Sequence, residues 1–411
     1  MQSVFLSKQN NVMKIKIVVH MILALLAAGL VFCGSAAAGL VPANSPRVKT
    51  MGRWIPGDNG ILCAGRGAVI ASVEFEGTGV QVQMFSDSAG DVWWLKKLDD
   101  GPLLRFKACM GMNDLYRDLS YGKHTLTMIR ETEGMRGVTI LRGFFIAGEQ
   151  EGAAGTEPAD GVRAAGKGIA KNKKPAARKK TDGMPAAPPV QEAPRRRSIE
   201  IIGDSVAAGA FIYPEGDYFE RESGYLAFGP RLARMLDADW SCVASSGEGA
   251  VRNNEEKAPY NAKHADDQIE RAFYTQTVPR WNNKMDDPDL VILAYGENDF
   301  NDTEHSPSDL YFKKQYKQLI LKLREFRPNS VIFCMTPANI VTSRRAVPGM
   351  SGAVAELREE GDAKVYFIDL NERGQLLDQE DFLDGVHPLA SGHEKIARYL
   401  LAQVRTVLGW D

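Results

Sequence analysis

The stretch Ile199-Glu200-Ile201-Ile202-Gly203-Asp204-Ser205 decides the fold of the C-terminal half. Its apolar residues indicate a short buried strand, and its Gly-Asp-Ser end indicates a turn where the chain leaves a sheet. Similar apolar runs occupy Trp240–Ala244, Leu290–Tyr295, Val331–Met335 and Val365–Ile368. Helical segments are predicted at Leu226–Leu236, Ser308–Phe326 and Ser391–Val407. We therefore expect an α/β domain over residues 198–411, with a parallel sheet covered by helices on both faces.

The N-terminal half has a different pattern, in which apolar residues alternate with other residues along short segments. Alternation runs through Val69–Phe75 and resumes at Val80–Met84 after the turn Gly77-Thr78-Gly79. Strand-like runs continue at Lys123–Arg130 and Gly137–Ile146. Several short strands at this spacing predict a small β-sandwich or jelly roll, which we place at residues 39–147.

Residues 1–38 have the pattern of a secretory signal peptide. Lys14 and Lys16 precede the largely apolar run Ile17–Phe32, and an Ala-x-Ala site ends at Ala38. We expect cleavage after Ala38 and export to the periplasm or the medium. The alternative is a retained membrane anchor formed by residues 17–38.

Residues 148–197 are rich in Ala, Gly, Pro, Lys and Arg and nearly lack large apolar side chains. Such a segment cannot bury enough surface to offset its ordering entropy, so a disordered linker is predicted. Its basic residues suggest either a solvated tether or a weak contact with anionic cell-surface polymer or lipid. They are Lys171, Lys173, Lys174, Arg178, Lys179, Lys180 and Arg195–Arg197.

The composition is that of a globular protein, with 44% hydrophobic residues, 25% charged residues and a formal net charge of −2 over 411 residues. This balance does not indicate a nucleic-acid partner. In an oxidising compartment, Cys63 and Cys109 are the first pair to test for a disulfide, whereas Cys242 and Cys334 lie in strand-like runs typical of buried free thiols. Because no Cys-x-x-Cys pair is present, we expect no zinc site, and no motif calls for another metal or cofactor.

Four polar motifs are expected at the ends of the predicted strands. They are Gly203-Asp204-Ser205, Ser246-Gly247-Glu248-Gly249, Gly296-Glu297-Asn298-Asp299 and Asp384-Gly385-Val386-His387. Each motif alone also fits an ordinary turn or a local structural contact. In open α/β sheets, however, ligands bind at the carboxyl ends of the strands, so the four motifs together predict one site. Asp and His three residues apart can meet, and the carboxylate can then orient the imidazole.

This set of motifs resembles the SGNH hydrolases, also called the GDS-type esterases and lipases. The resemblance implies a flavodoxin-like three-layer fold with Ser205 as nucleophile, His387 as general base and Asp384 orienting the histidine. It also implies an oxyanion hole formed by the N–H groups of Ser205 and Gly247 and by the Asn298 side chain.

A β-sandwich preceding such a unit is similar to the two-domain acetylesterases of carbohydrate esterase family two. Residues 240–253, residues 289–300, Gly122-Lys123-His124 and the run Arg130-Glu131-Thr132-Glu133 also resemble that family. Two departures are the long basic linker and the presence of Asp384, since some members lack the acidic partner of the histidine.

The resemblance implies an exported serine esterase that removes acetyl or other short acyl groups from a sugar or polysaccharide. Small residues near Ser205, among them Ala207, Ala208 and Ala210, favour a short acyl group. Tyr260 and Trp281 are expected either to stack on a sugar or to pack in the core. Two alternatives remain: an O-acyltransferase or lipase-like esterase using the same residues, and a non-catalytic carbohydrate-binding protein of the cell surface. The second alternative requires a broken catalytic motif, and all four are intact.

Overall fold

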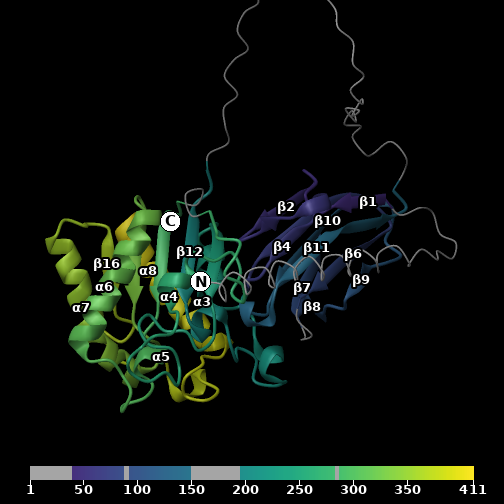
Figure 1. Cartoon of the computed structure of the whole chain (residues 1–411). Helices are drawn as coiled ribbons and strands as arrows, with labels where there is room; N and C mark the ends of the chain where they lie inside the picture. The colour runs from purple at the N-terminus through teal and green to yellow at the C-terminus, as the bar shows by residue number, and fades with distance from the viewer. Residues whose placement is uncertain (1–38, 88–91, 150–194, 283–286) are drawn as a thin grey trace, which may run out of the picture.

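The computed structural model describes residues 39–87, 92–149, 195–282 and 287–411. The predicted signal peptide, with the alternative membrane anchor, and nearly all of the predicted linker lie outside these ranges. No helix within the described ranges is both long and apolar enough to cross a membrane. Figure 1 shows two domains side by side, an antiparallel β domain and a domain of alternating strands and helices.

The N-terminal domain is a sandwich of two antiparallel sheets, as the alternation of apolar residues predicts. One sheet has the order β3-β4-β11-β6-β9 with β1 also paired to β11, and the other has the order β2-β5-β10-β7-β8. Buried side chains from both sheets, including Val73, Val82 and Phe144, form one core between them. The strands are β1 (Gly39–Pro42), β2 (Val48–Met51), β3 (Ile55–Pro56), β4 (Leu62–Ala64), β5 (Ile70–Gly77), β6 (Gly79–Ser86), β7 (Trp93–Leu98), β8 (Leu104–Lys107), β9 (Gly111–Tyr116), β10 (Gly122–Arg130) and β11 (Thr139–Ala147).

The C-terminal domain is built on a five-stranded parallel sheet with the order β13-β12-β14-β15-β16. In sequence order this is 2-1-3-4-5, the flavodoxin-like arrangement, so the predicted fold class is confirmed. The strands are β12 (Ser198–Gly203), β13 (Asp239–Ala244), β14 (Leu290–Ala294), β15 (Val331–Met335) and β16 (Val365–Ile368). The helices are α2 (Ser205–Ala208), α3 (Phe228–Met235), α4 (Ala265–Gln268), α5 (Glu297–Phe300), α6 (Asp309–Phe326), α7 (Ile340–Glu359) and α8 (Ala390–Leu408).

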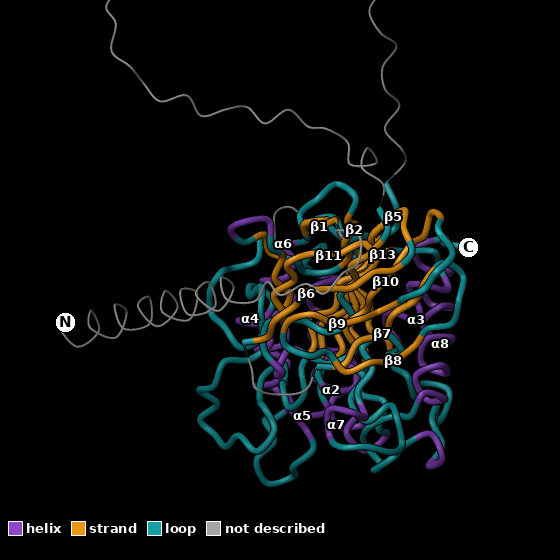
Figure 2. Tube along the Cα trace, turned by 90° about the vertical axis from the view of Figure 1, so that its right-hand side faces the viewer, coloured by secondary structure: helices purple, strands orange, loops and turns teal. Residues whose placement is uncertain are grey.

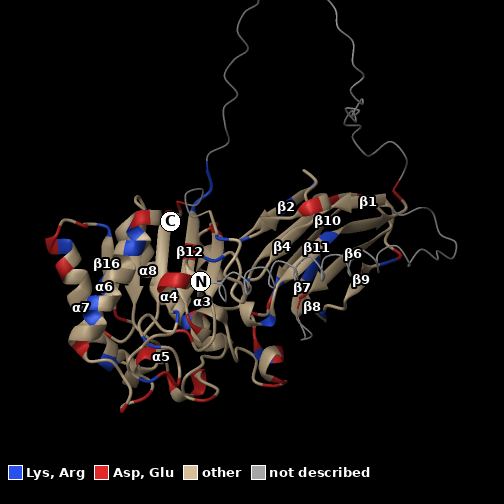
Figure 3. Ribbon diagram, viewed as in Figure 1, with Lys and Arg blue, Asp and Glu red and all other residues tan. Residues whose placement is uncertain are grey.

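Helices cover both faces of this sheet because successive strand residues point to opposite sides. Ile201 and Ile292 face the core that contains Leu232 and Leu400 of α3 and α8. Ile202 and Leu293 face the opposite core, which α6 and α7 complete. The outer surfaces of α6 and α7 carry interspersed charges of both signs (Figure 3), and Lys313 and Lys317 form ion pairs with Glu356.

Helix α7, the longest helix in the described part of the chain, was not anticipated from the sequence. Its centre reads Val347-Pro348-Gly349-Met350, and Pro and Gly normally interrupt helices. Gly349 has a packing reason, since a Cβ there would lie 2.6 Å from the Cδ1 atom of Phe312 on α6. The close approach of α6 and α7 therefore needs a residue that breaks the helical pattern.

The two domains share a buried junction at the amino end of the parallel sheet. Arg53 of the sandwich lies 3.0 Å from a carboxylate oxygen of Glu200 on β12, and Arg327 lies 2.8 Å from the other oxygen. Burial alone would raise the pKa of Glu200, but the two guanidinium groups lower it below its usual value. The Trp240 indole N–H also donates to the carbonyl of Ala68, at 2.9 Å. The junction thus joins the domains through paired charges and hydrogen bonds.

The cysteines do not pair as first suggested. All four described cysteines are free thiols, including Cys63 and Cys109. Cys63 lies on β4 and Cys109 precedes β9, and the strands β11 and β6 separate these two positions in the sheet. Three strand spacings amount to about 14 Å, roughly twice the Cα separation that a disulfide spans. Cys242 and Cys334 are buried free thiols, as predicted.

Candidate active site

Ser205 lies where β12 ends and α2 begins, in a tight turn that the sequence Gly-Asp-Ser makes possible. The carboxylate of Asp204 caps α2 by accepting from the backbone N–H of Val206 at 3.0 Å. A Cβ on Gly203 would lie 2.6 Å from the carbonyl oxygen of Ala294, so glycine is needed for this close approach between strands. The turn therefore holds Ser205 at the carboxyl end of the sheet.

The structure brings Ser205, His387 and Asp384 into one hydrogen-bonded series. His387 Nε2 lies 3.0 Å from Ser205 Oγ, and His387 Nδ1 lies 2.7 Å from Asp384 Oδ2. The other carboxylate oxygen of Asp384 accepts from the backbone N–H groups of Val386 and His387, at 3.0 Å and 2.7 Å. Burial opposes ionisation of Asp384, but these hydrogen bonds and the nearby imidazole lower its pKa below the ordinary value.

Gly247 and Asn298 follow β13 and β14, the two strands that flank β12. Gly247 has a φ of 77°, a conformation that favours glycine. The Asn298 side-chain amide donates one hydrogen to the carbonyl of Glu248 at 2.8 Å, which fixes its orientation and leaves its second hydrogen available. Figure 2 shows α2, α5 and α7 at the same end of the molecule. The predicted oxyanion-hole residues thus lie at adjoining strand ends.

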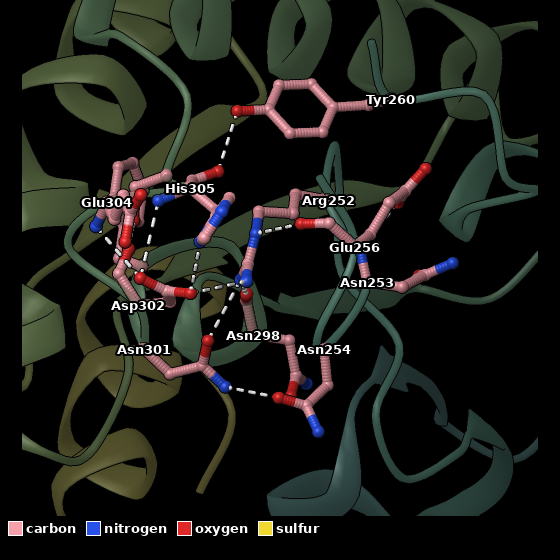
Figure 4. A network of polar contacts seen from close by, with 12 residues as sticks. Arg252, Asn253, Asn254, Glu256, Tyr260, Asn298, Asn301, Asp302, Glu304 and His305 are labelled. Atoms are coloured by element: carbon pink, nitrogen blue, oxygen red, sulfur yellow. Dashed lines mark hydrogen bonds and ion pairs between the residues drawn. The ribbon is translucent and has the colours of Figure 1, made fainter. Parts of the chain in front are cut away.

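The loops that carry these two residues are connected by buried Arg252, whose contacts Figure 4 shows, and by buried Asp299. The Arg252 guanidinium donates to the carbonyls of Glu256 and Asn298 and, at 2.9 Å, to the side chain of Asn301. The carboxylate of Asp299 accepts from three successive backbone N–H groups, those of Ala250, Val251 and Arg252, at 2.8–3.0 Å. Asp299 belongs to one of the four motifs and Arg252 to a stretch that resembles the family, but the sequence assigned neither a role, because these contacts join segments 46–49 residues apart.

Phe211 is a further residue of the site that the sequence did not reveal. Its ring centroid lies 4.8 Å from that of His387, and the guanidinium of Arg221 lies 4.7 Å from the Phe211 ring. The Phe211 backbone has a φ of 56°, which is unusual for a residue other than glycine. This backbone conformation places the Phe211 ring against the His387 imidazole.

Glu297 is a buried carboxyl group beside the proposed oxyanion donor Asn298. The Thr342 hydroxyl donates to Glu297 Oε2 at 2.6 Å, while Oε1 is buried without a hydrogen-bond partner. Burial raises the pKa of Glu297 to about 7; the Thr342 hydrogen bond opposes this shift and the charge of Asp384 adds to it. A titratable group with a near-neutral pKa therefore adjoins the site.

The two aromatic residues considered for sugar stacking have packing roles. The Tyr260 hydroxyl donates to the carbonyl of His305 at 2.8 Å, and its ring lies against Tyr311. Trp281 packs against the small apolar cluster of Val138 and Phe273, near the amino end of the sheet and away from Ser205. The alternative of core packing fits both residues.

The described histidines other than His387 make contacts of other kinds. His393 is fully buried, and its Nδ1 accepts from the N–H of Phe228 at 3.1 Å. Burial lowers the pKa of His393 to about 3, so it is neutral at physiological pH. The remaining three each contact one carboxylate: His124 contacts Asp99, His264 contacts Glu256, and His305 contacts Asp302. Among the described residues, no group of three or more His, Cys, Asp or Glu side chains is placed to hold a metal ion.

A strand-end serine contacting a histidine whose second ring nitrogen meets a carboxylate has the geometry of a serine hydrolase. Residues 201–395 match the model of the GDSL-like Lipase/Acylhydrolase family, and this part of the chain belongs to that family. The predicted SGNH relationship is thereby confirmed.

The chain is similar to curated carbohydrate-active proteins along most of its length. It is 26% identical over 387 residues to the cellulase/esterase CelE of Acetivibrio thermocellus, covering 89% of this chain and 40% of that protein. It is 23% identical over 382 residues to an acetylxylan esterase / glucomannan deacetylase of Cellvibrio japonicus, covering 90% and 91%. The chain thus spans less than half of the first relative and most of the second.

Solved structures share the same two-domain fold. A family two carbohydrate esterase from Cellvibrio japonicus has a TM-score of 0.71 at 22% identity, covering 91% of this chain and 99% of that chain. A family two carbohydrate esterase from Clostridium thermocellum, solved in complex with cellohexaose, has a TM-score of 0.68 at 22% identity, covering 89% and 100%.

Proposed function

We propose that this chain is a carbohydrate acetylesterase that works through a Ser205 acyl-enzyme. The observation that carries the proposal is the series Ser205–His387–Asp384, with its separations of 3.0 Å and 2.7 Å. Similarity to an acetylxylan esterase / glucomannan deacetylase over 90% of the chain supports acetylated polysaccharide as the substrate.

In the proposed first step, His387 Nε2 accepts the Ser205 hydroxyl proton while Oγ attacks the ester carbonyl. The developing oxyanion is stabilised by the N–H groups of Ser205 and Gly247 and by the free amide hydrogen of Asn298. His387 then protonates the departing sugar oxygen. Water, activated by the same imidazole, releases acetate from the acyl-enzyme.

The choice of acetyl rests on the relatives rather than on the small residues near Ser205. Ala207, Ala208 and Ala210 are at most 3% exposed, so they pack inside the domain. Their size therefore gives no measure of acyl chain length.

Export remains part of the proposal. The pattern of residues 1–38 supports it, and cleavage after Ala38 would leave β1, which begins at Gly39 and pairs with β11, intact. The mass of the mature protein isolated from its native cells tests this step, and a chain that retains residues 1–38 would contradict it.

The activity is tested by comparing wild type with Ser205→Ala on 4-nitrophenyl acetate, butyrate and octanoate, and then on acetylated xylan and glucomannan. Wild type should release acetate and prefer the shortest ester, and Ser205→Ala should be inactive. Ser351→Ala is a matched control, because that hydroxyl bonds only within α7, to Val347 and Pro348. A fluorophosphonate should label wild type and Ser351→Ala but not Ser205→Ala.

Several outcomes would overturn the proposal in different ways. Equal activity of Ser205→Ala and wild type would exclude the acyl-enzyme mechanism. Acetyl transfer to a second sugar without release of acetate would indicate an acyltransferase, and a preference for octanoate would indicate a lipase-like esterase. Sugar binding by an inactive wild type would indicate a binding protein.

A further inference from the structure

The run Arg130-Glu131-Thr132-Glu133 leaves β10 of the sandwich and enters the junction with the hydrolase domain. All four of these residues are fully buried or nearly so. Arg130 is held within the sandwich, where its guanidinium donates to the carbonyls of Ala64, Thr132 and Gly137, at 2.9–3.0 Å. The two glutamates reach instead across the junction.

Glu133 bonds to the residues that immediately precede Gly247. Its Oε2 accepts from the backbone N–H of Ser246 at 2.6 Å and from the hydroxyl of Ser245 at 3.0 Å. A carboxylate that accepts a backbone N–H makes a charge-assisted hydrogen bond, which is stronger than one between neutral groups. One sandwich side chain therefore fixes the peptide that leads into the proposed oxyanion donor.

Glu131 holds the segment that follows the nucleophile. Its Oε1 accepts from the hydroxyls of Tyr213 and Ser223, at 2.9 Å and 2.6 Å. The Ser223 N–H in turn donates to the carbonyl of Gly209, the residue that ends helix α2, at 2.9 Å. Since α2 begins at Ser205, Glu131 connects the sandwich, through Ser223, to the helix that carries the proposed nucleophile.

Glu222 of the hydrolase domain completes the junction. Its carboxylate oxygen accepts from the backbone N–H of Glu133 at 3.0 Å. Burial, and then the neighbouring charge of Glu133, raise the pKa of Glu222 to about 10. Glu222 is therefore a neutral acid at physiological pH, and the two carboxyl groups together carry no more than one negative charge.

We propose that Glu133 is a positioning residue for the oxyanion-hole loop, so that a complete active site requires the β-sandwich as well as the hydrolase domain. This inference rests on the proposed function, because it takes the Gly247 N–H as an oxyanion donor. Such donors act only when held within a fraction of an ångström of their working positions. The sandwich would then be part of the catalytic scaffold rather than a separable appendage.

The test compares Glu133→Ala, Glu133→Gln and Arg53→Met in the full chain. Glu133→Ala should lower kcat for 4-nitrophenyl acetate by about ten- to a hundredfold with little change in KM, since it loosens a transition-state donor. Glu133→Gln keeps an oxygen that can accept from Ser246, so kcat should stay within about fivefold of wild type. Arg53→Met weakens the junction at its far end, near Glu200, and should lower the melting temperature without lowering kcat.

Hydrogen exchange of the backbone amides of residues 245–249 provides a readout that does not depend on esterase activity. Exchange there should be faster in Glu133→Ala than in wild type and unchanged in Arg53→Met. If Glu133→Ala does not fold, Ser245→Ala removes one of the two contacts and should show the same changes to a smaller degree.

Wild-type kcat and wild-type exchange in Glu133→Ala would overturn the inference. The inference would also be overturned if kcat fell in both Glu133→Ala and Arg53→Met in proportion to the fall in melting temperature, because kcat would then report only lost stability. If wild type hydrolyses no ester, the proposed function fails, while the exchange measurement still decides whether Glu133 positions the loop.

Discussion

The buried guanidinium of Arg252 donates a hydrogen bond to the backbone carbonyl of Asn298, whose side chain is a proposed oxyanion donor. The same guanidinium donates to the carbonyl of Glu256 at 2.8 Å. Arg252 therefore connects the loop after β13 with the start of α5. Two of the three proposed oxyanion donors, Gly247 and Asn298, belong to these two segments, so the distance between them depends on this side chain.

Replacing Arg252 should impair both turnover and stability. Arg252→Lys keeps the charge but cannot bond to Glu256, Asn298 and Asn301 at once, because an ammonium lacks the planar fork of a guanidinium. We expect kcat to fall about tenfold and the free energy of unfolding to fall by about 2–3 kcal/mol. Ester hydrolysis and urea denaturation measure the two effects.

Arg345→Lys is the matched control for this variant. The Arg345 guanidinium also bonds to a carbonyl of α5, that of Phe300, at 2.6 Å. Because Phe300 has no proposed role in the reaction, kcat should be close to wild type. Equal losses of kcat in the two variants would show that Arg252 has no special relation to Asn298.

Removal of the Asn298 amide should slow the chemical step while the fold persists. Asn298→Ala loses one oxyanion donor, which typically lowers kcat by about a hundred- to a thousandfold. Asn329→Ala is a suitable control, since that amide bonds to Asp287 at the opposite end of the sheet. Normal turnover by a folded Asn298→Ala protein would remove Asn298 from the mechanism.

The local patterns of the sequence were sufficient for the five strands of the hydrolase domain and for three of its helices, α3, α6 and α8. Strands β15 and β16 match their predicted bounds, because continuous apolar runs between charged or turn residues leave little ambiguity. Helix α7 was missed because Pro348 and Gly349 interrupt its periodicity. Gly349 is required there because the helix packs closely against Phe312 of α6.

The sequence indicated the proposed catalytic residues, but not the residues that hold them in position. Ser205, Gly247, Asn298 and His387 stand in short motifs at strand ends, and a family resemblance identifies such motifs. Glu133 and Arg252 lie in stretches that resemble the same family, but the resemblance assigned them no role, because their roles consist of contacts to segments 113 and 46 residues away. Contacts between distant segments become visible only once the fold is known.

The environment of Asp384 predicts that Asn is a worse replacement than Ala. In Asp384→Asn the backbone N–H groups of Val386 and His387 would still select an oxygen at the Oδ1 position. The new NH₂ group would then face His387 Nδ1 and favour the tautomer whose proton is on Nε2, which cannot accept a proton from Ser205.

We therefore expect kcat of Asp384→Asn to fall about 10⁴-fold and that of Asp384→Ala to fall less. Asp99→Asn, which alters a similar Asp–His contact of 2.8 Å in the sandwich, should leave kcat unchanged. A smaller loss in Asp384→Asn than in Asp384→Ala would contradict the tautomer argument.

Glu297 should make the stability of the protein fall as pH rises from about 4.5 to 7. Its pKa is raised from 4.5 to about 7 in the folded chain, chiefly by burial. Between these values the folded state holds a proton that the unfolded state releases, so folding becomes less favourable with rising pH. The loss should reach about 3 kcal/mol by pH 8 and then level off.

Glu297→Gln should remove this dependence, since the neutral amide oxygen can still accept from the Thr342 hydroxyl at the Oε2 position. Relative to this variant, wild type should be of similar stability near pH 4.5 and less stable at pH 8. Urea denaturation of both proteins across this range measures the difference, and Glu325→Gln, on the exposed face of α6, should follow the wild-type curve. Parallel curves for wild type and Glu297→Gln would mean that Glu297 ionises at the same pH in both states. In that case Glu297 Oε1 would have a hydrogen-bond donor in solution that stabilises the ionised carboxylate.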